Sequence, residues 1–118
     1  GNTFYLLQEL KRSGADMIIR EQIALGKAYI GESAGAVIVA PSITYIEDMD
    51  DRAAAPDLSD CSALGLVDFY PLPHMNSFPF KKASRKIAGK YSNSLPIKAM
   101  TNNQAICVCN NEIKIIGK

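Results

Sequence analysis

The chain has 118 residues, of which 47% are hydrophobic and 21% are charged, and its formal net charge is +1. This balance predicts a globular protein with one domain, and it gives no reason to expect a nucleic-acid or anionic-membrane partner. With no apolar run near the ~20 residues that span a bilayer, no signal-peptide pattern and only three cysteines, we expect a cytoplasmic protein without a disulfide framework.

Two helices are predicted at the start of the chain. Asn2 or Thr3 can cap a helix over residues 4–12, and Gly14 terminates it. Its aromatic and aliphatic side chains share one face at helical spacing, so we interpret them as core residues. A second helix is expected from Ala15 to about residue 26. Its apolar positions are Met17, Ile18, Ile19, Ile23 and Ala24.

A serine motif follows between two apolar segments. Ala28–Ile30 predicts a buried strand, and Ala36–Ala40 predicts a helix that Pro41 ends. Between them lies Gly31-Glu32-Ser33-Ala34-Gly35, a G-x-S-x-G pattern. A strand, this pattern and then a helix predict a nucleophile elbow, in which the glycines allow close approach and the serine hydroxyl projects outward. Ser33 is therefore the candidate nucleophile, and the alternative is a purely structural Gly-Ser turn.

The middle of the chain supplies acidic, histidine and basic segments. Residues 43–45 predict a short strand, and residues 47–61 form an acidic loop long enough to suggest a function. A strand near residues 69–72 then leads to His74, the only histidine. A helix is expected over residues 79–91. We interpret its basic side chains as a solvated face, with a phosphate-binding patch as the alternative.

Three strands are predicted in the last part of the chain, at residues 97–100, 104–109 and 112–116. Asn110-Asn111 predicts a tight hairpin between the last two. Cys107 and Cys109 share one face of a strand, and we interpret them as core residues. One C-x-C pair with a single distant histidine is a poor zinc signal, and phosphate-loop and dinucleotide motifs are absent. We therefore expect no metal and no cofactor.

A serine nucleophile needs a base, and in this chain a Ser–His mechanism must use His74. Functional groups of open α/β sheets gather at the carboxyl ends of strands, so His74 and Ser33 are expected to meet. The third member should be a carboxylate that holds the imidazole tautomer. The carboxylate candidates, among which the pattern does not choose, are Glu47, Asp48, Asp50 and Asp51. Glu32, which lies beside the serine, is instead expected to line a substrate pocket.

With these residues in view, the chain resembles the peptidase E family of serine peptidases, family S51, across most of its length. Residues 1–7 are similar to the end of that family's G-G-G-N-T-F-x-L-L segment, and residues 28–36 are similar to its Y-I-G-x-S-A-G-A segment. Further similar elements follow in the same order. They are Pro41 with the later Asp48-Met49 pair, Leu64-Gly65-Leu66 and Pro73-His74.

The resemblance implies an α/β fold related to class I glutamine amidotransferases, with a mainly parallel sheet flanked by helices. It implies that Ser33 is the nucleophile, His74 the base and Asp48 the acid. The backbone N–H groups of Gly1 and Ala34 match the oxyanion donors. The family cleaves the bond after an N-terminal aspartate in dipeptides and uses no metal.

Two departures from the family pattern bear on substrate specificity. Glu32 stands where peptidase E often has Trp, and Met75-Asn76-Ser77 replaces Phe-Thr-Asn, which makes Asn76 a second candidate pocket residue. Because the first residues already resemble part of a site, we expect residues 1–118 to be the C-terminal portion of one longer domain. The expected partner is a short peptide substrate. A homo-oligomer, or a second chain that carries the missing strands, would be further partners.

Two other functions stay open at this point. The same serine and histidine would serve an esterase or amidase. A chain of this fold could also be a non-catalytic binding or assembly module.

Overall fold

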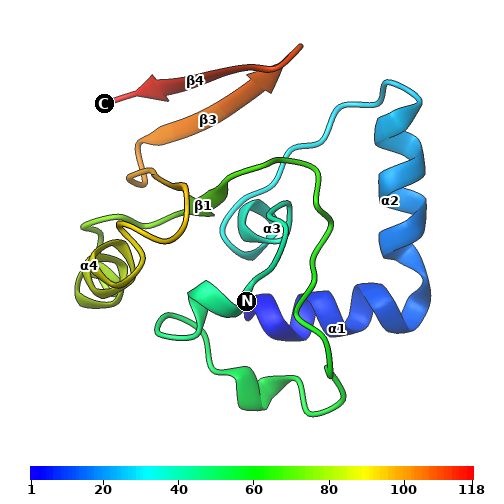
Figure 1. Cartoon of the computed structure of the whole chain (residues 1–118), viewed down its shortest axis with the longest axis horizontal. Helices are drawn as coiled ribbons and strands as arrows, with labels where there is room; N and C mark the ends of the chain where they lie inside the picture. The colour runs from blue at the N-terminus through cyan, green and yellow to red at the C-terminus, as the bar shows by residue number, and fades with distance from the viewer.

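Two helices open the chain in the computed structural model, which describes residues 1–118 (Figure 1). Helix α1 spans Thr3–Ser13 and helix α2 spans Ala15–Ala24. The side chain of Asn2 accepts a hydrogen bond from the N–H of Tyr5, and Gly14, with φ 79°, ends α1 in the left-handed conformation. The side chain of Asn2 thus caps the start of α1, and the missing Cβ of Gly14 allows the helix to end there, as the sequence predicts.

The two helices differ in how much of their apolar surface they bury. Phe4 and Leu7 of α1 are fully buried, which confirms their predicted place in the core. Met17 and Ile18 of α2 are instead 70% and 59% exposed. Helix α2 therefore contributes little to the core, and Figure 1 shows it turning away from α1 at the edge of the molecule.

The segment around Ser33 differs from its predicted elements. Residues 28–32 form no strand, and Ile30 is 96% exposed, because no neighbouring strand offers the backbone a partner. Helix α3 spans only Ala34–Val37. The strand predicted at residues 43–45 is wrong: the chain forms a 3₁₀ turn, η1, at Thr44–Ile46, in which backbone N–H groups bond three residues back. A second such turn, η2, spans Arg52–Ala54.

Two short parallel strands form the centre of the fold. Strand β1 (Tyr70–Leu72) pairs with β2 (Ile97–Ala99), and Leu72 lies opposite Ala99. Helix α4 (Lys81–Lys90) makes the crossover between them. These three elements follow the predicted order, so the α/β class is confirmed. The parallel part of the sheet has two strands here.

An antiparallel hairpin ends the chain. Strand β3 (Gln104–Cys109) pairs with β4 (Glu112–Gly117) through Asn110 and Asn111, whose φ angles of 50° and 68° suit a two-residue turn. Figure 1 shows this hairpin at one end of the molecule, away from α1 and α2. The predicted burial of Cys107 and Cys109 is wrong, because β3 pairs only with β4 and both thiols are exposed.

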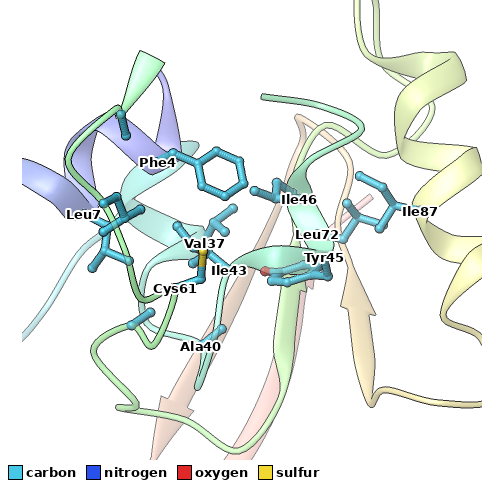
Figure 2. Close-up of a cluster of buried hydrophobic side chains, with 13 residues drawn as sticks. Phe4, Leu7, Val37, Ala40, Ile43, Tyr45, Ile46, Cys61, Leu72 and Ile87 are labelled. Carbon is cyan, nitrogen blue, oxygen red and sulfur yellow. The ribbon is translucent and has the colours of Figure 1, made fainter. Parts of the chain in front are cut away.

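One hydrophobic cluster joins the elements that carry the site (Figure 2). It brings together side chains from α1, α3, η1, β1 and α4, so these elements are packed on one another. Its largest fully buried members include Phe4, Val37, Tyr45, Leu72 and Ile87. None of the helices combines the length and the apolar character needed to cross a membrane.

Candidate active site

Ser33 lies directly before α3 in a strained backbone conformation. Its φ is 54° and its ψ is −115°, values that residues with a Cβ rarely adopt. A Cβ on Gly31 would lie 2.3 Å from the carbonyl oxygen of Gly35, so only glycine fits there. The hydroxyl of Tyr29 donates a hydrogen bond to that same carbonyl. The chain therefore folds tightly around Ser33, which is half-buried.

His74 lies two residues after β1 and reaches Ser33 across the fold. Its Nε2 atom is 2.9 Å from the Oγ atom of Ser33, although 41 residues separate the two in sequence. The backbone of His74 also has a positive φ, of 62°. The sequence predicts that these two side chains meet, and the hydrogen bond between them agrees with that prediction.

An aromatic side chain covers one face of the imidazole. The ring of Phe80 stacks on His74, with the two centroids 4.9 Å apart and the planes inclined by 27°. The intervening turn is fixed by hydrogen bonds from the N–H of Ser77 to the His74 carbonyl and from the N–H of Phe80 to the Ser77 carbonyl. The turn that follows His74 thus folds back, so that Phe80 lies against the imidazole.

Asn102 occupies the other side of the imidazole. Its Oδ1 atom lies 2.8 Å from Nδ1 of His74. Asn102 follows β2 as His74 follows β1, and the parallel pairing of Leu72 with Ala99 brings both strand ends to one edge. Sequence reasoning missed Asn102. The available signal was the strand at residues 97–100, whose carboxyl end would adjoin that of residues 69–72 if the two were parallel neighbours.

Asp48 does not take the position next to the histidine. Its carboxylate lies 3.2 Å from Nζ of Lys86 and 3.5 Å from Nζ of Lys90, and it makes no hydrogen bond with His74. The hydrogen bond with Lys86 is the main cause that holds the pKa of Asp48 below its usual value, and Asp48 in turn raises the pKa of Lys90. The expected contact between Asp48 and His74 therefore does not form, because two ammonium groups of α4 bind this carboxylate.

The other three acidic candidates also have different partners. Glu47 lies 3.8 Å from Nζ of Lys90. Asp50 accepts a hydrogen bond from the backbone N–H of Thr3, and Asp51 accepts one from the N–H of Ala53. Asp50 and Asp51 thus bind backbone N–H groups near the starts of α1 and η2, and Glu47 pairs with a lysine of α4. None of these carboxylates binds the imidazole.

The two candidate pocket residues lie on either side of the Ser33–His74 pair in sequence. Glu32 is exposed, and its carbonyl accepts a hydrogen bond from the N–H of Gly35. Asn76 is also exposed, and its Oδ1 accepts a hydrogen bond of 2.7 Å from Nε of Arg85. Arg85 therefore places a positive charge beside Asn76, the residue two positions after His74 in sequence.

The two candidate oxyanion donors differ in their surroundings. The N–H of Ala34 makes no backbone hydrogen bond at the start of α3, so it is free to donate to a ligand beside Ser33. Gly1 is exposed before α1, and no hydrogen bond ties it to the Ser33 turn.

Comparison with known proteins shows which family this chain resembles. The model of peptidase family S51 matches residues 1–116. An uncharacterised peptidase of Listeria innocua is 55% identical over 113 residues, which are 96% of this chain and 54% of that protein. An uncharacterised peptidase of Pasteurella multocida is 55% identical over 116 residues, or 98% of this chain and 56% of that protein. The chain thus spans about half the length of the curated relatives it matches.

A solved structure shows the same arrangement of the chain. The 1.5 Å crystal structure of a Listeria monocytogenes protein with a provisional peptidase E name superposes with a TM-score of 0.93 and 49% identity. The match covers all of this chain and 56% of that one.

Proposed function

Because this chain belongs to peptidase family S51, we propose that it is the Ser–His-bearing part of a serine peptidase that hydrolyses short peptides. The observation that carries the proposal is the 2.9 Å contact between Oγ of Ser33 and Nε2 of His74. A serine hydroxyl is a poor nucleophile at neutral pH unless an adjacent base takes its proton. The family and the contact both favour acyl transfer.

The proposed reaction has two steps. Oγ of Ser33 attacks the scissile carbonyl carbon while Nε2 of His74 takes the hydroxyl proton. His74 then gives this proton to the leaving amine as the C–N bond breaks, which leaves an acyl-serine. A water molecule, deprotonated by the same nitrogen, then attacks the acyl carbon. The bond from this carbon to Oγ breaks, His74 returns the proton to Oγ, and the product leaves as a carboxylic acid.

The oxyanion of each tetrahedral intermediate needs hydrogen-bond donors. We assign this role to the unpaired N–H of Ala34 and, following the family resemblance, to the N–H of Gly1. The strained backbone of Ser33, directly before α3, supports the assignment of a nucleophile elbow, a turn in which the serine hydroxyl projects at the start of the following helix. A fold of the class I glutamine amidotransferase type is part of the same proposal.

The proposed substrates are short peptides, including dipeptides with an N-terminal aspartate. The guanidinium of Arg85, held beside Asn76, would attract an acidic substrate side chain. The exposed carboxylate of Glu32 next to Ser33 would oppose it. The balance between these two charges therefore sets how strongly an aspartate is preferred over a neutral residue.

Hydrolysis of a panel of aminoacyl p-nitroanilides, with aspartyl p-nitroanilide included, tests the proposal. Ser33→Ala should lower kcat by about 10³–10⁶-fold, the range seen when triad members are removed in serine proteases. Ser59→Ala is the matched control, because Ser59 is exposed and lies beside Lys11 and Arg12 of α1, and the kcat of this variant should not change. Full activity in Ser33→Ala would contradict the proposal. Turnover confined to the matching esters would identify an esterase instead.

A further inference from the structure

We propose that Tyr29 is a positioning residue for Ser33, because its side chain bridges the two ends of the turn that carries the serine. The inference rests on the proposed function, since it concerns what holds the proposed nucleophile. The Ser33 turn comprises residues 29–35. The hydroxyl of Tyr29 donates a hydrogen bond to the carbonyl of Gly35, so the first and the last residue of this turn are joined.

The ring of Tyr29 also lies against the first glycine of the turn. Its Cε1 atom is 2.8 Å from the position that a Cβ of Gly31 would take, and its hydroxyl oxygen is 3.7 Å from the position that a Cβ of Gly35 would take. Tyr29 itself is half-buried. One side chain therefore reaches both glycines of the serine motif, and each glycine leaves room for it.

The carbonyl of Gly35 depends on this hydroxyl for its hydrogen bond. Helix α3 ends at Val37, so it is too short to supply an N–H four residues after Gly35, and no other backbone N–H donates to this oxygen. Tyr29 keeps its proton at neutral pH, since burial raises its pKa above the ordinary value of 10.0. Its hydroxyl is thus a permanent donor to an acceptor that would otherwise have no partner in the protein.

The strained backbone of Ser33 needs such a restraint. A residue with a φ of 54° and a ψ of −115° persists only where the surrounding structure holds it. The N–H groups of Ala36 and Val37 donate to the Ser33 carbonyl, and these bonds fix the backbone after the serine. Tyr29 adds the link to the backbone before it. The turn is therefore held on both sides, and with it the direction of Oγ toward Nε2 of His74.

Amide hydrogen exchange tests this brace without any need for turnover. Tyr29→Phe keeps the ring and removes only the hydroxyl. The N–H groups of residues 35–37 should then exchange roughly fivefold faster, as expected for the loss of one hydrogen bond, while those of α4 should be unchanged. Tyr5→Phe is the matched control, because it removes the same hydroxyl from a side chain that is 51% exposed on α1, and it should behave as wild type.

Kinetics separate a positioning role from a structural one. Tyr29→Phe should lower kcat roughly 10-fold and change KM by less than about twofold. The loss should be smaller than the ~10²-fold effect of a 1 Å displacement, because the ring still lies against Gly31. Replacement of Tyr29 by 4-aminophenylalanine, whose amine N–H can donate to the Gly35 carbonyl, should recover most of the lost kcat.

Three results would overturn the inference. They are unchanged exchange at residues 35–37 in Tyr29→Phe, faster exchange with an unchanged kcat, and a loss of kcat that 4-aminophenylalanine does not recover. If one of these is found while activity still depends on Ser33, only the role of Tyr29 is wrong. If activity does not depend on Ser33, the proposed function itself is wrong, and this inference with it.

Discussion

The ring of Phe80 lies against the imidazole of His74, with the two centroids 4.9 Å apart. This contact restricts rotation of the histidine about its side-chain torsions, as Asn102 does through Nδ1. We expect Phe80→Ala to lower kcat by about 10–100-fold, because an imidazole that moves by about 1 Å loses its alignment with Ser33. Steady-state kinetics with the best substrate of the panel measure the effect.

Phe78→Ala is the control for this prediction. Phe78 lies in the same turn but is 92% exposed, so its removal should leave kcat within about twofold of wild type. Equal losses in the two variants would show that the turn as a whole matters, and that the stacked ring has no particular role.

Gly31→Ala should destabilise the fold by about 1–3 kcal/mol and abolish activity. The new methyl group would meet the Gly35 carbonyl oxygen at 2.3 Å and the Tyr29 ring at 2.8 Å, so the Ser33 turn would have to open. Denaturant unfolding followed by circular dichroism measures the change in the free energy of unfolding.

A second glycine variant provides the contrast. Gly89 lies inside α4, and a Cβ there meets nothing within 4 Å. Gly89→Ala should therefore stabilise the chain by about 0.5–1 kcal/mol, the difference in helix propensity between the two residues. A Gly31→Ala chain as stable and active as Gly89→Ala would show that the turn is not sterically closed.

Asp48→Asn should lower Tm by roughly 2–5 °C at pH 7 and leave kcat within about twofold of wild type. Lys86 holds the folded-state pKa of Asp48 below its ordinary value of 3.8. A carboxyl with a lowered folded pKa stabilises the fold above its unfolded pKa, and this stability is lost as the pH falls through the folded pKa. The difference in Tm should thus be present at pH 7 and become smaller at an acidic pH below 3.8, the ordinary pKa of the group.

Thermal unfolding of both chains at the two pH values measures this difference. Asp60→Asn makes a useful comparison, because the carboxylate of Asp60 accepts a hydrogen bond from the N–H of Ser62 far from α4. A loss of kcat by Asp48→Asn as large as that of Ser33→Ala would show that Asp48 is a member of the triad.

Much of the fold follows from local sequence signals. Asn2 and Gly14 carry the chemistry of helix ends, and Asn110-Asn111 carries that of a tight hairpin turn, so the elements they bound form as predicted. The segment at 28–30 does not, because a strand depends on a partner that periodicity cannot supply. The exposure of Cys107 has the same origin: alternation along a strand says which residues share a face, but not whether anything covers it.

The candidate site also contains residues that the sequence predicts and residues that it does not. Ser33 and His74 could be found because one lies in a recognisable motif and the other is the only histidine. Asn102 could not, since an asparagine in a polar turn has no distinctive pattern and its role depends on the parallel pairing of β1 with β2. Asp48 was preferred by the family resemblance, whereas the charges of Lys86 and Lys90 on α4 decide where its carboxylate lies.

Covalent labelling by a fluorophosphonate tests the central claim, that His74 activates Ser33, most directly. The reagent reacts with activated serine hydroxyls and does not depend on which peptide the protein prefers. Intact-mass and peptide mass spectrometry should find one adduct, on Ser33, formed at least about 10²-fold more slowly in His74→Ala and absent in Ser33→Ala. An unlabelled wild-type chain, an adduct on another serine, or equal labelling in Ser33→Ala would contradict the claim.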